Sequence, residues 1–184
     1  VADMPFLSYQ ASEEDAIRNA GELLSRAGAE AVKVEGGIAI AKTISRMVEL
    51  GIPVMGHIGF TPQSIHNLGG FKVQGRGDSR EQLIEDALAV QEAGAYAVVL
   101  ELVPAELANE LTKLLSIPTI GIGAGNGTDG QILVWTDFAG LYPGKPRKFV
   151  KQYAQLRETL LSAAKNYRAE VSEGVFPSAD HSHD

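Results

Sequence analysis

The chain of 184 residues is long enough for one sizeable core, and its 45% hydrophobic and 21% charged residues are typical of a globular domain. A formal net charge of −7 disfavours nucleic acid or an anionic membrane surface as a partner, because phosphate binding is driven by clustered Lys and Arg. The absence of Cys excludes disulfides, thiolate metal sites and a Cys nucleophile. Since no apolar run reaches the length of a membrane span and no signal-peptide pattern is present, we expect a cytoplasmic protein that acts on small molecules.

The first third of the chain alternates apolar strands with amphipathic helices. Residues 1–6 resemble the end of a strand, which favours a start further upstream. Ser12 and the acidic residues after it predict a helix N-cap, and the helix continues through Leu24 until Gly28 can end it. The pattern then predicts a strand over 31–35, a helix over 37–50 and a strand over 52–57.

Residues 58–80 interrupt this alternation with glycine and proline turn signals, and a loop of this length in a compact domain is usually functional. The sequence next predicts a helix over 79–92, a strand over 97–101, a helix after Pro104, and strands over 117–123 and 131–136. Apolar residues at helical spacing then predict an amphipathic helix over 147–171.

A weak internal repeat supports an array of βα units. Residues 26–35 align without gaps with residues 92–101, and each segment holds a helix end, a glycine and an apolar strand. The alignment makes Glu35 and Glu101 equivalent, each at the end of its strand.

About six strands, all parallel, predict an α/β fold, either a (β/α)8 TIM barrel or an open doubly wound sheet. Polar residues or glycine stand at the ends of five different strands, which favours the barrel: Asp3, Lys33 with Glu35, His57, Glu101 and Gly123. A complete barrel needs about 250 residues, so we expect its first strands, roughly two βα units, to be missing before Val1.

We therefore expect three parts within the chain. Residues 1–145 form the barrel portion, with about six βα units. Residues 146–171 hold a C-terminal amphipathic helix that packs on the barrel or on a neighbouring subunit, and residues 172–184 form a polar tail.

The strand over 31–35 carries two charges where a buried parallel strand is normally apolar. Because strand side chains alternate, Lys33 and Glu35 project to one face, while Val32 and Val34 project to the other. A charge in a dry interior must be compensated by another charge, a metal or a ligand. The pair is therefore either a structural ion pair or one side of a functional site.

Three carboxylates, Asp3, Glu35 and Glu101, follow strands, and a hard divalent cation such as Mg²⁺ prefers oxygen ligands. Lys33 could bind a substrate carboxylate or an enolate oxygen, or form a Schiff base. The apolar surroundings of Glu101 would make its carboxylate a stronger base, suited to proton transfer. The alternative for Glu101 is a solvated carboxylate where its strand leaves the core.

Other polar residues carry less information. We expect His57 to be a hydrogen-bonded structural residue without a catalytic role, and His181 and His183 to lie on the surface of the tail. Lys72 and Arg76 could hold an anion, although a solvated loop fits them equally well. The glycines between 121 and 127 do not complete a dinucleotide-binding fingerprint, which excludes nicotinamide binding on that ground.

Five separated motifs stand out when the chain is viewed as a whole: Ala2–Phe6, Val32–Gly37, Gly56–Gln63, Gly69–Gly77 and Gly121–Asn126. In this order they resemble the ketopantoate hydroxymethyltransferase family. The resemblance extends to a tail motif at Glu170–Pro177 and so covers nearly the whole chain. The family's upstream Gly-Asp-Ser motif, which supplies another metal ligand and a substrate-binding serine, is absent from this sequence.

The resemblance implies a magnesium-dependent (β/α)8 barrel of the phosphoenolpyruvate mutase and isocitrate lyase superfamily, in a ring-like homo-oligomer. It implies transfer of a hydroxymethyl group from 5,10-methylenetetrahydrofolate to 3-methyl-2-oxobutanoate, which gives 2-dehydropantoate for pantothenate synthesis. By position, Asp3 would bind both Mg²⁺ and the oxo acid, Glu35 would bind Mg²⁺ directly or through water, Lys33 would bind the substrate, and Glu101 would transfer the proton.

Two alternatives stay open at this point. One is a magnesium-dependent lyase or mutase of the same superfamily that acts on another oxo acid without folate. The other is a noncatalytic fragment or scaffold, suggested by the missing first strands.

Overall fold

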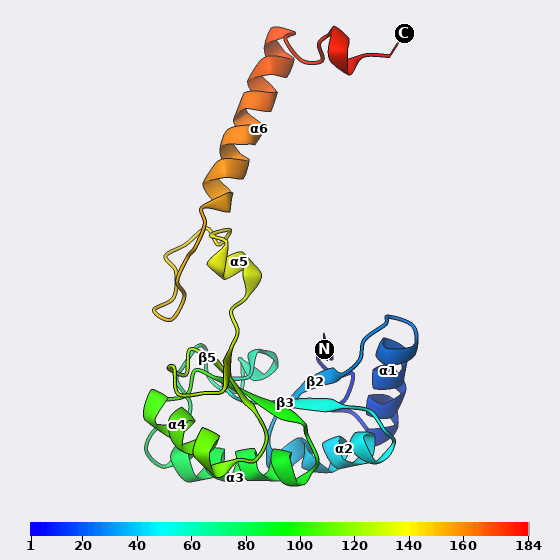
Figure 1. Ribbon diagram of the computed structural model, residues 1–184, viewed down its shortest axis with the longest axis vertical. Helices are drawn as coiled ribbons and strands as arrows, with labels where there is room; N and C mark the ends of the chain where they lie inside the picture. Colours follow the sequence, from blue (N-terminus) through cyan, green and yellow to red (C-terminus); the bar gives the residue numbers. More distant parts are fainter. Residues whose placement is uncertain (184) are drawn as a thin grey trace. The chain divides into compact units, whose positions relative to one another are not determined.

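Six parallel strands form one sheet in the computed structural model, which describes residues 1–183 (Figure 1). Each strand pairs with the strands that precede and follow it in the sequence, so the order across the sheet is β1 to β6. The strands are β1 (Ala2–Asp3), β2 (Val32–Glu35), β3 (Val54–Gly59), β4 (Ala97–Glu101), β5 (Thr119–Ile122) and β6 (Gly130–Gln131). The predicted α/β class, the strand number and the parallel direction are confirmed.

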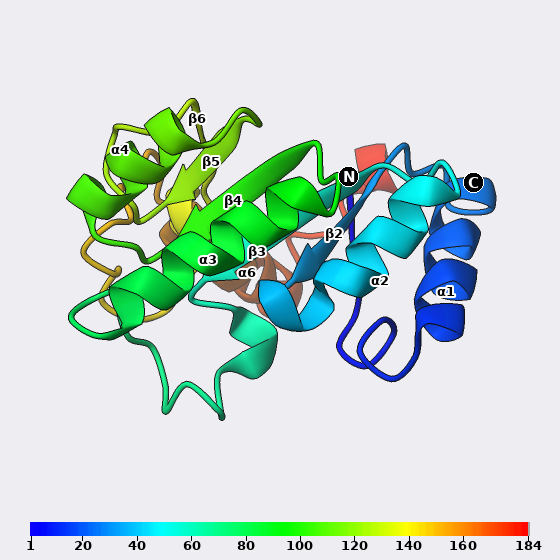
Figure 2. The same ribbon diagram turned by 90° about the horizontal axis from the view of Figure 1, so that it is seen from below.

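Helices connect the first five strands, because a parallel pair needs a crossover connection. They are α1 (Glu13–Ser25), α2 (Ile38–Glu49), α3 (Ser79–Glu92) and α4 (Ala105–Leu114). Figure 2 shows α2 and α3 lying across the same side of the sheet. The sequential strand order with helices on one side is that of a half-barrel, and within residues 1–183 the strands β1 and β6 do not pair with each other.

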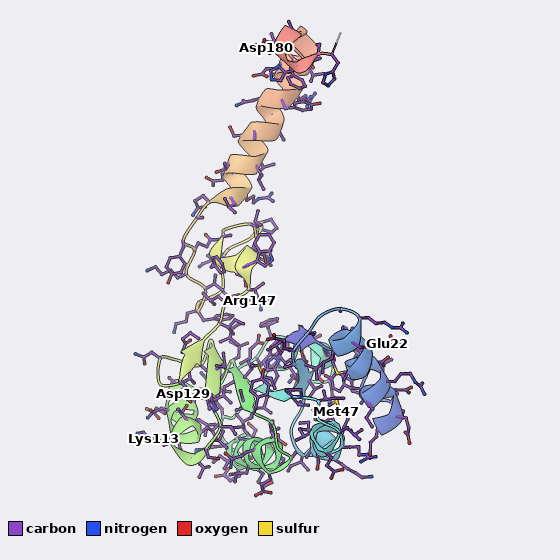
Figure 3. The ribbon with its side chains drawn as sticks, turned by 45° about the vertical axis from the view of Figure 1, so that its right-hand side comes forward. Glu22, Met47, Lys113, Asp129, Arg147 and Asp180 are labelled. Atoms are coloured by element: carbon purple, nitrogen blue, oxygen red, sulfur yellow. The ribbon has the colours of Figure 1, made fainter. Side chains whose placement is uncertain are left out.

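The core lies between the strands and these helices. Val32, Val34, Val98 and Leu100 are fully buried and belong to this core. Met47 of α2 is also fully buried on the sheet side of its helix (Figure 3). On each strand, the residues that alternate with these core residues face the opposite side of the sheet, as the alternation predicts.

Local signals explain where most elements begin. The Oγ of Ser12 accepts a hydrogen bond of 3.1 Å from the backbone N–H of Asp15, which confirms the predicted cap of α1. Strand β3 begins at Val54, two residues after the predicted start at residue 52. The N–H of Ile52 bonds to the carbonyl of Met47 in the preceding turn, and Pro53 has no N–H to donate.

The predicted strand over 131–136 is wrong. Strand β6 ends at Gln131, and α5 (Trp135–Phe138) begins four residues later. The carbonyl of Val134 accepts hydrogen bonds from the N–H groups of Asp137 and Phe138, so this apolar run forms a helical turn.

The amphipathic helix begins later than predicted, since α6 spans Leu156–Glu173 and residues 147–155 contain no helix. The N–H groups of Tyr153 and Leu156 donate to the carbonyls of Phe138 and Ala139, which draws this segment onto the turn after α5. A short 3-10 turn, η2 (Ala179–His181), lies in the tail, and another, η1 (Pro62–Ser64), lies in the loop after β3.

The chain forms two compact units, Val1–Ile132 with the sheet and a second that begins at Leu133. The predicted parts 1–145, 146–171 and 172–184, and the packing of the helix on the barrel or on a neighbouring subunit, stay predictions. Among residues 1–183, no helix combines the length and the apolar character that crossing a membrane requires.

Candidate active site

Five polar side chains come from the carboxyl ends of the first four strands: Asp3, Lys33, Glu35, His57 and Glu101. The register pairs Asp3 with Lys33 and Glu35 with His57. Glu101 is paired with Gly59, two residues beyond His57 on the same strand. Paired residues of parallel strands share a face, and side chains alternate along each strand, so the register places all five on the face opposite the core residues Val32, Val34, Val98 and Leu100.

Lys33 is the cation of this group. Its Nζ lies 2.7 Å from Oδ1 of Asp3, 3.9 Å from Oε1 of Glu35 and 3.3 Å from Nδ1 of His57. Its side chain is 18% exposed. The carboxylates of β1 and β2 thus compensate the charge that the sequence placed on a buried strand, and the ammonium remains partly open to a ligand.

Glu35 is the most deeply buried carboxylate of the group, with a side chain that is 3% exposed. Its Oε2 accepts a hydrogen bond of 2.9 Å from the backbone N–H of Gln63. Its Oε1 lies 3.7 Å from Nδ1 of His57 and 3.9 Å from Lys33, both beyond hydrogen-bond distance. Burial raises the pKa of the Glu35 carboxyl, although the hydrogen bond from Gln63 and the charge of Lys33 oppose this shift.

The donor set fits a hard cation in part. Among residues 1–183, no group of three or more His, Asp or Glu side chains is arranged to hold a metal ion. Asp3 and Glu35 nevertheless lie on either side of one ammonium, and Oε1 of Glu35 has no hydrogen-bond donor within reach. Mg²⁺ often takes only one or two protein carboxylates and completes its shell with water and substrate. These two residues could therefore supply part of such a shell.

Glu101 ends β4, and its side chain is 10% exposed. Its carbonyl accepts a hydrogen bond of 2.8 Å from the N–H of Phe60. Gly59 has a φ of +88°, and a Cβ there would clash with this carbonyl and lie 2.8 Å from Cγ2 of Val103. Leu102 has a φ of 49°, in the left-handed region that non-glycine residues seldom adopt. The backbone on both sides of Glu101 is thus fixed by close contacts.

His57 is the residue that the sequence analysis undervalued. Its side chain is 4% exposed, and its two ring nitrogens face Lys33 and Glu101, at 3.3 Å and 3.2 Å. The alternation that placed Lys33 and Glu35 on one face also places His57 there, one strand further on. That signal was available in the sequence, but a strand-end histidine alone did not reveal its neighbours.

Two further residues that the sequence analysis missed support Glu35 from outside the strands. The Tyr9 hydroxyl accepts a hydrogen bond of 2.9 Å from the N–H of Glu35 and donates one of 2.8 Å to Oε1 of Gln63. The Gln63 amide donates one of 2.8 Å to the carbonyl of Met4. Burial raises the pKa of Tyr9 far above its ordinary value, so the hydroxyl stays protonated. Gln63 thus joins the segment after β1, the end of β2 and the loop after β3.

The remaining candidates lie outside this cluster. Lys72 and Arg76 are exposed in the loop after β3, and His181 and His183 are exposed in the tail. Gly123 follows β5 with a φ of 65°.

The chain is similar in sequence to one family of known proteins. Residues 1–179 match the sequence model described as "Ketopantoate hydroxymethyltransferase". A 3-methyl-2-oxobutanoate hydroxymethyltransferase of Leifsonia xyli subsp. xyli is 57% identical over 182 residues, which are 99% of this chain and 66% of that protein. One of Acidothermus cellulolyticus is 58% identical over 183 residues, 100% of this chain and 68% of that protein. The chain thus spans about two thirds of the length of these curated relatives.

A solved structure supports the barrel architecture. The phosphonopyruvate hydrolase complex with oxalate and Mg²⁺ aligns with a TM-score of 0.52 and 14% sequence identity, over 98% of this chain and 65% of that chain. At this identity the likeness shows the fold alone, and it confirms the predicted barrel type for the six strands. The chain belongs to the ketopantoate hydroxymethyltransferase family.

Proposed function

We propose that this chain forms part of an enzyme that transfers a hydroxymethyl group from 5,10-methylenetetrahydrofolate to 3-methyl-2-oxobutanoate, with 2-dehydropantoate as the product for pantothenate synthesis. The proposal rests on the five clustered side chains Asp3, Lys33, Glu35, His57 and Glu101, called the rim below. In the rim, carboxylates bind one cation, and a separate carboxylate lies nearby. Lys33 lies 2.7 Å from Asp3, and Glu101 lies across His57 from it. The family names support the same reaction class.

The two sides of this rim suit the two halves of the reaction. Removal of a proton from C3 of the oxo acid needs a base. Asp3 and Glu35 lie beside Lys33, whereas Glu101 lies beside His57, which makes Glu101 the candidate base. The negative charge that develops on the 2-oxo oxygen needs a nearby donor, and the Lys33 ammonium is the cation of the rim. Mg²⁺ held by Asp3 and Glu35 would supply Lewis acidity to the same oxygen.

The proposed reaction has two steps, proton removal and carbon–carbon bond formation. Glu101 takes the C3 proton, and the electron pair of that C–H bond forms the enolate. The enolate carbon then bonds to the methylene carbon carried by the folate, the two bonds between that carbon and the folate nitrogens break, and water supplies the hydroxyl oxygen. The folate nitrogens take up one proton from Glu101 and one from this water, which restores the Glu101 carboxylate. Tetrahydrofolate and 2-dehydropantoate leave.

Deuterium exchange at C3 of 3-methyl-2-oxobutanoate tests this assignment in the protein that carries this sequence. Glu101→Gln should lower magnesium-dependent exchange by about 10²- to 10⁴-fold, since a positioned general base contributes that much. Unchanged exchange in this variant would exclude Glu101 as the base. Product formation that requires methylenetetrahydrofolate supports the transferase, whereas cleavage of an oxo acid without folate would favour a lyase of the same superfamily.

We further propose a homo-oligomeric, cytoplasmic enzyme. The apolar side chains of α6 support association with another surface, because its own unit, as described from Leu133 to residue 183, buries no residue of this helix and several are large: Leu156, Leu160, Leu161, Tyr167 and Val171. Light scattering of the purified protein tests this, and a monomeric mass would contradict it.

A further inference from the structure

His57 touches both the cation and the base of the rim, and the chemistry of Lys33 determines where the histidine carries its proton. Nζ of Lys33 lies 3.3 Å from Nδ1 of His57. An ammonium group has three donors and no acceptor, so Nδ1 must be the acceptor of this contact. A neutral imidazole with an accepting Nδ1 carries its proton on Nε2.

That proton faces Glu101. Nε2 lies 3.2 Å from Oε2 of Glu101, and both side chains are nearly buried, at 4% and 10% exposed. The direction between the two groups does not complete a hydrogen bond, so the buried Nε2 of His57 has no hydrogen-bond partner among residues 1–183. A buried donor without a partner is unfavourable, so a small rotation of the Glu101 carboxylate onto Nε2–H is favourable.

We propose that His57 is a positioning residue for Glu101. The Nε2–H tautomer, selected by Lys33, holds Oε2 of Glu101 and leaves Oε1 free to accept the proton of the oxo acid. The inference rests on the proposed function for the role of Glu101, while the placement of the proton on His57 rests on the contact with Lys33 alone. Because β2, β3 and β4 are neighbours in the sheet, the three side chains are linked through adjacent strands.

The histidine offers two substitutions that separate its nitrogens. A Gln amide reaches the place of Nε2 and can donate to Glu101, whereas an Asn amide reaches only the place of Nδ1. His57→Gln should keep C3 deuterium exchange within about threefold of wild type, while His57→Asn should lower it by about 10- to 100-fold, the cost of misplacing a catalytic group. The KM for the oxo acid should change little in both, because the effect acts on the base and not on substrate binding.

His66→Gln is the matched control, since His66 is exposed in the loop after β3 and should leave exchange unchanged. Equal exchange rates in His57→Gln and His57→Asn would overturn the proposal, as would a loss in both that appears mainly in KM. Urea unfolding of each variant separates a loss of fold from a loss of positioning.

The position of the His57 proton can also be measured in the wild-type protein, so this test does not depend on whether a variant folds. Long-range ¹H–¹⁵N spectra of histidine-labelled protein should show His57 as the neutral Nε2–H tautomer, and an Nδ1–H tautomer would overturn the proposal. If the wild-type protein shows no magnesium-dependent C3 exchange, the proposed function fails, and the tautomer still decides whether Lys33 sets the His57 proton.

Discussion

The backbone N–H of Gln63 donates a hydrogen bond of 2.9 Å to Oε2 of Glu35, 28 residues earlier in the chain. The Gln63 side chain at the same time bonds to Met4 and Tyr9. One loop residue therefore holds the buried carboxylate of β2 and the segment after β1 together.

Gln63→Ala should weaken both stability and metal affinity. It keeps the N–H that bonds Glu35 but removes the donor to the carbonyl of Met4 and the nearer acceptor of the Tyr9 hydroxyl, which should cost about 1–3 kcal/mol. Urea unfolding and calorimetric Mn²⁺ titration measure the two effects. Gln10→Ala is the control, because Gln10 is exposed and its side-chain amide donates a hydrogen bond of 3.0 Å to Oε1 of Gln63 from the surface. Equal stability of the two variants would show that Gln63 does not anchor the loop.

Glu35→Gln should change the pH dependence of stability. Burial raises the pKa of the Glu35 carboxyl above 4.5, its ordinary value, so the folded protein binds this proton more tightly than the unfolded chain does. This contribution to stability is fully present below pH 4.5 and is lost as pH rises through the higher folded value. The metal-free variant should therefore melt at a higher temperature than wild type at pH 7, and the difference should shrink towards pH 4.5.

Thermal unfolding across this pH range checks the effect of Glu35. Glu92→Gln serves as the control, since Glu92 is an exposed residue at the end of α3 and should leave the pH profile as in wild type. Parallel profiles for wild type and Glu35→Gln would contradict the prediction. The gain in stability should come with a loss of Mn²⁺ affinity, because the amide replaces a carboxylate ligand.

Lys33→Met should lower C3 exchange by about 10²- to 10³-fold, which is the typical effect of removing one donor to a developing oxyanion. The substitution keeps the length of the side chain and removes its charge. Lys72→Met is the matched control in the exposed loop after β3 and should keep wild-type exchange. A comparable loss in Lys72→Met would instead assign an anion-binding role to that loop.

Gly59→Ala should destabilise the protein more than Gly28→Ala does. Both glycines have a positive φ, +88° and +71°, but an added Cβ meets the Glu101 carbonyl and Val103 at Gly59 and nothing within 4 Å at Gly28. We expect about 1 kcal/mol for Gly28→Ala and about 1–3 kcal/mol more for Gly59→Ala. Urea unfolding compares them, and similar losses would mean that the end of β3 tolerates a wider separation from Glu101.

The sequence predicted the parts of the fold that depend on local patterns. The alternation in β2 placed Lys33 and Glu35 away from the core, and Ser12 marked the start of α1, because each signal involves neighbours in sequence. The apolar residues from Ile132 to Trp135 gave a strand pattern although they lie at a change between units, where Val134 caps a helical turn.

The sequence predicted the charged residues of the candidate site but not the contacts that support them. Their places at strand ends singled out Asp3, Lys33, Glu35 and Glu101, and the motif resemblance then implied a role for each. The contacts of Tyr9 with Gln63 join residues 54 positions apart, and no period or cap signal encodes such a pair. Alternation along the strands is enough to place His57 on the same face as Lys33. Its distances to Lys33 and Glu101 depend in addition on the register of three strands, which local patterns do not encode.

The sequential order of the strands also bears on how the site arises during synthesis. Each strand docks on the one made just before it, so a growing chain can add βα units in the order in which they emerge. Asp3, Lys33, Glu35 and His57 all precede α3, whereas Glu101 arrives only with β4. A nascent chain that ended after β3 would hold Asp3, Lys33, Glu35 and His57 without Glu101, and on the proposed function one further βα unit would add the base to the surface that binds the substrate.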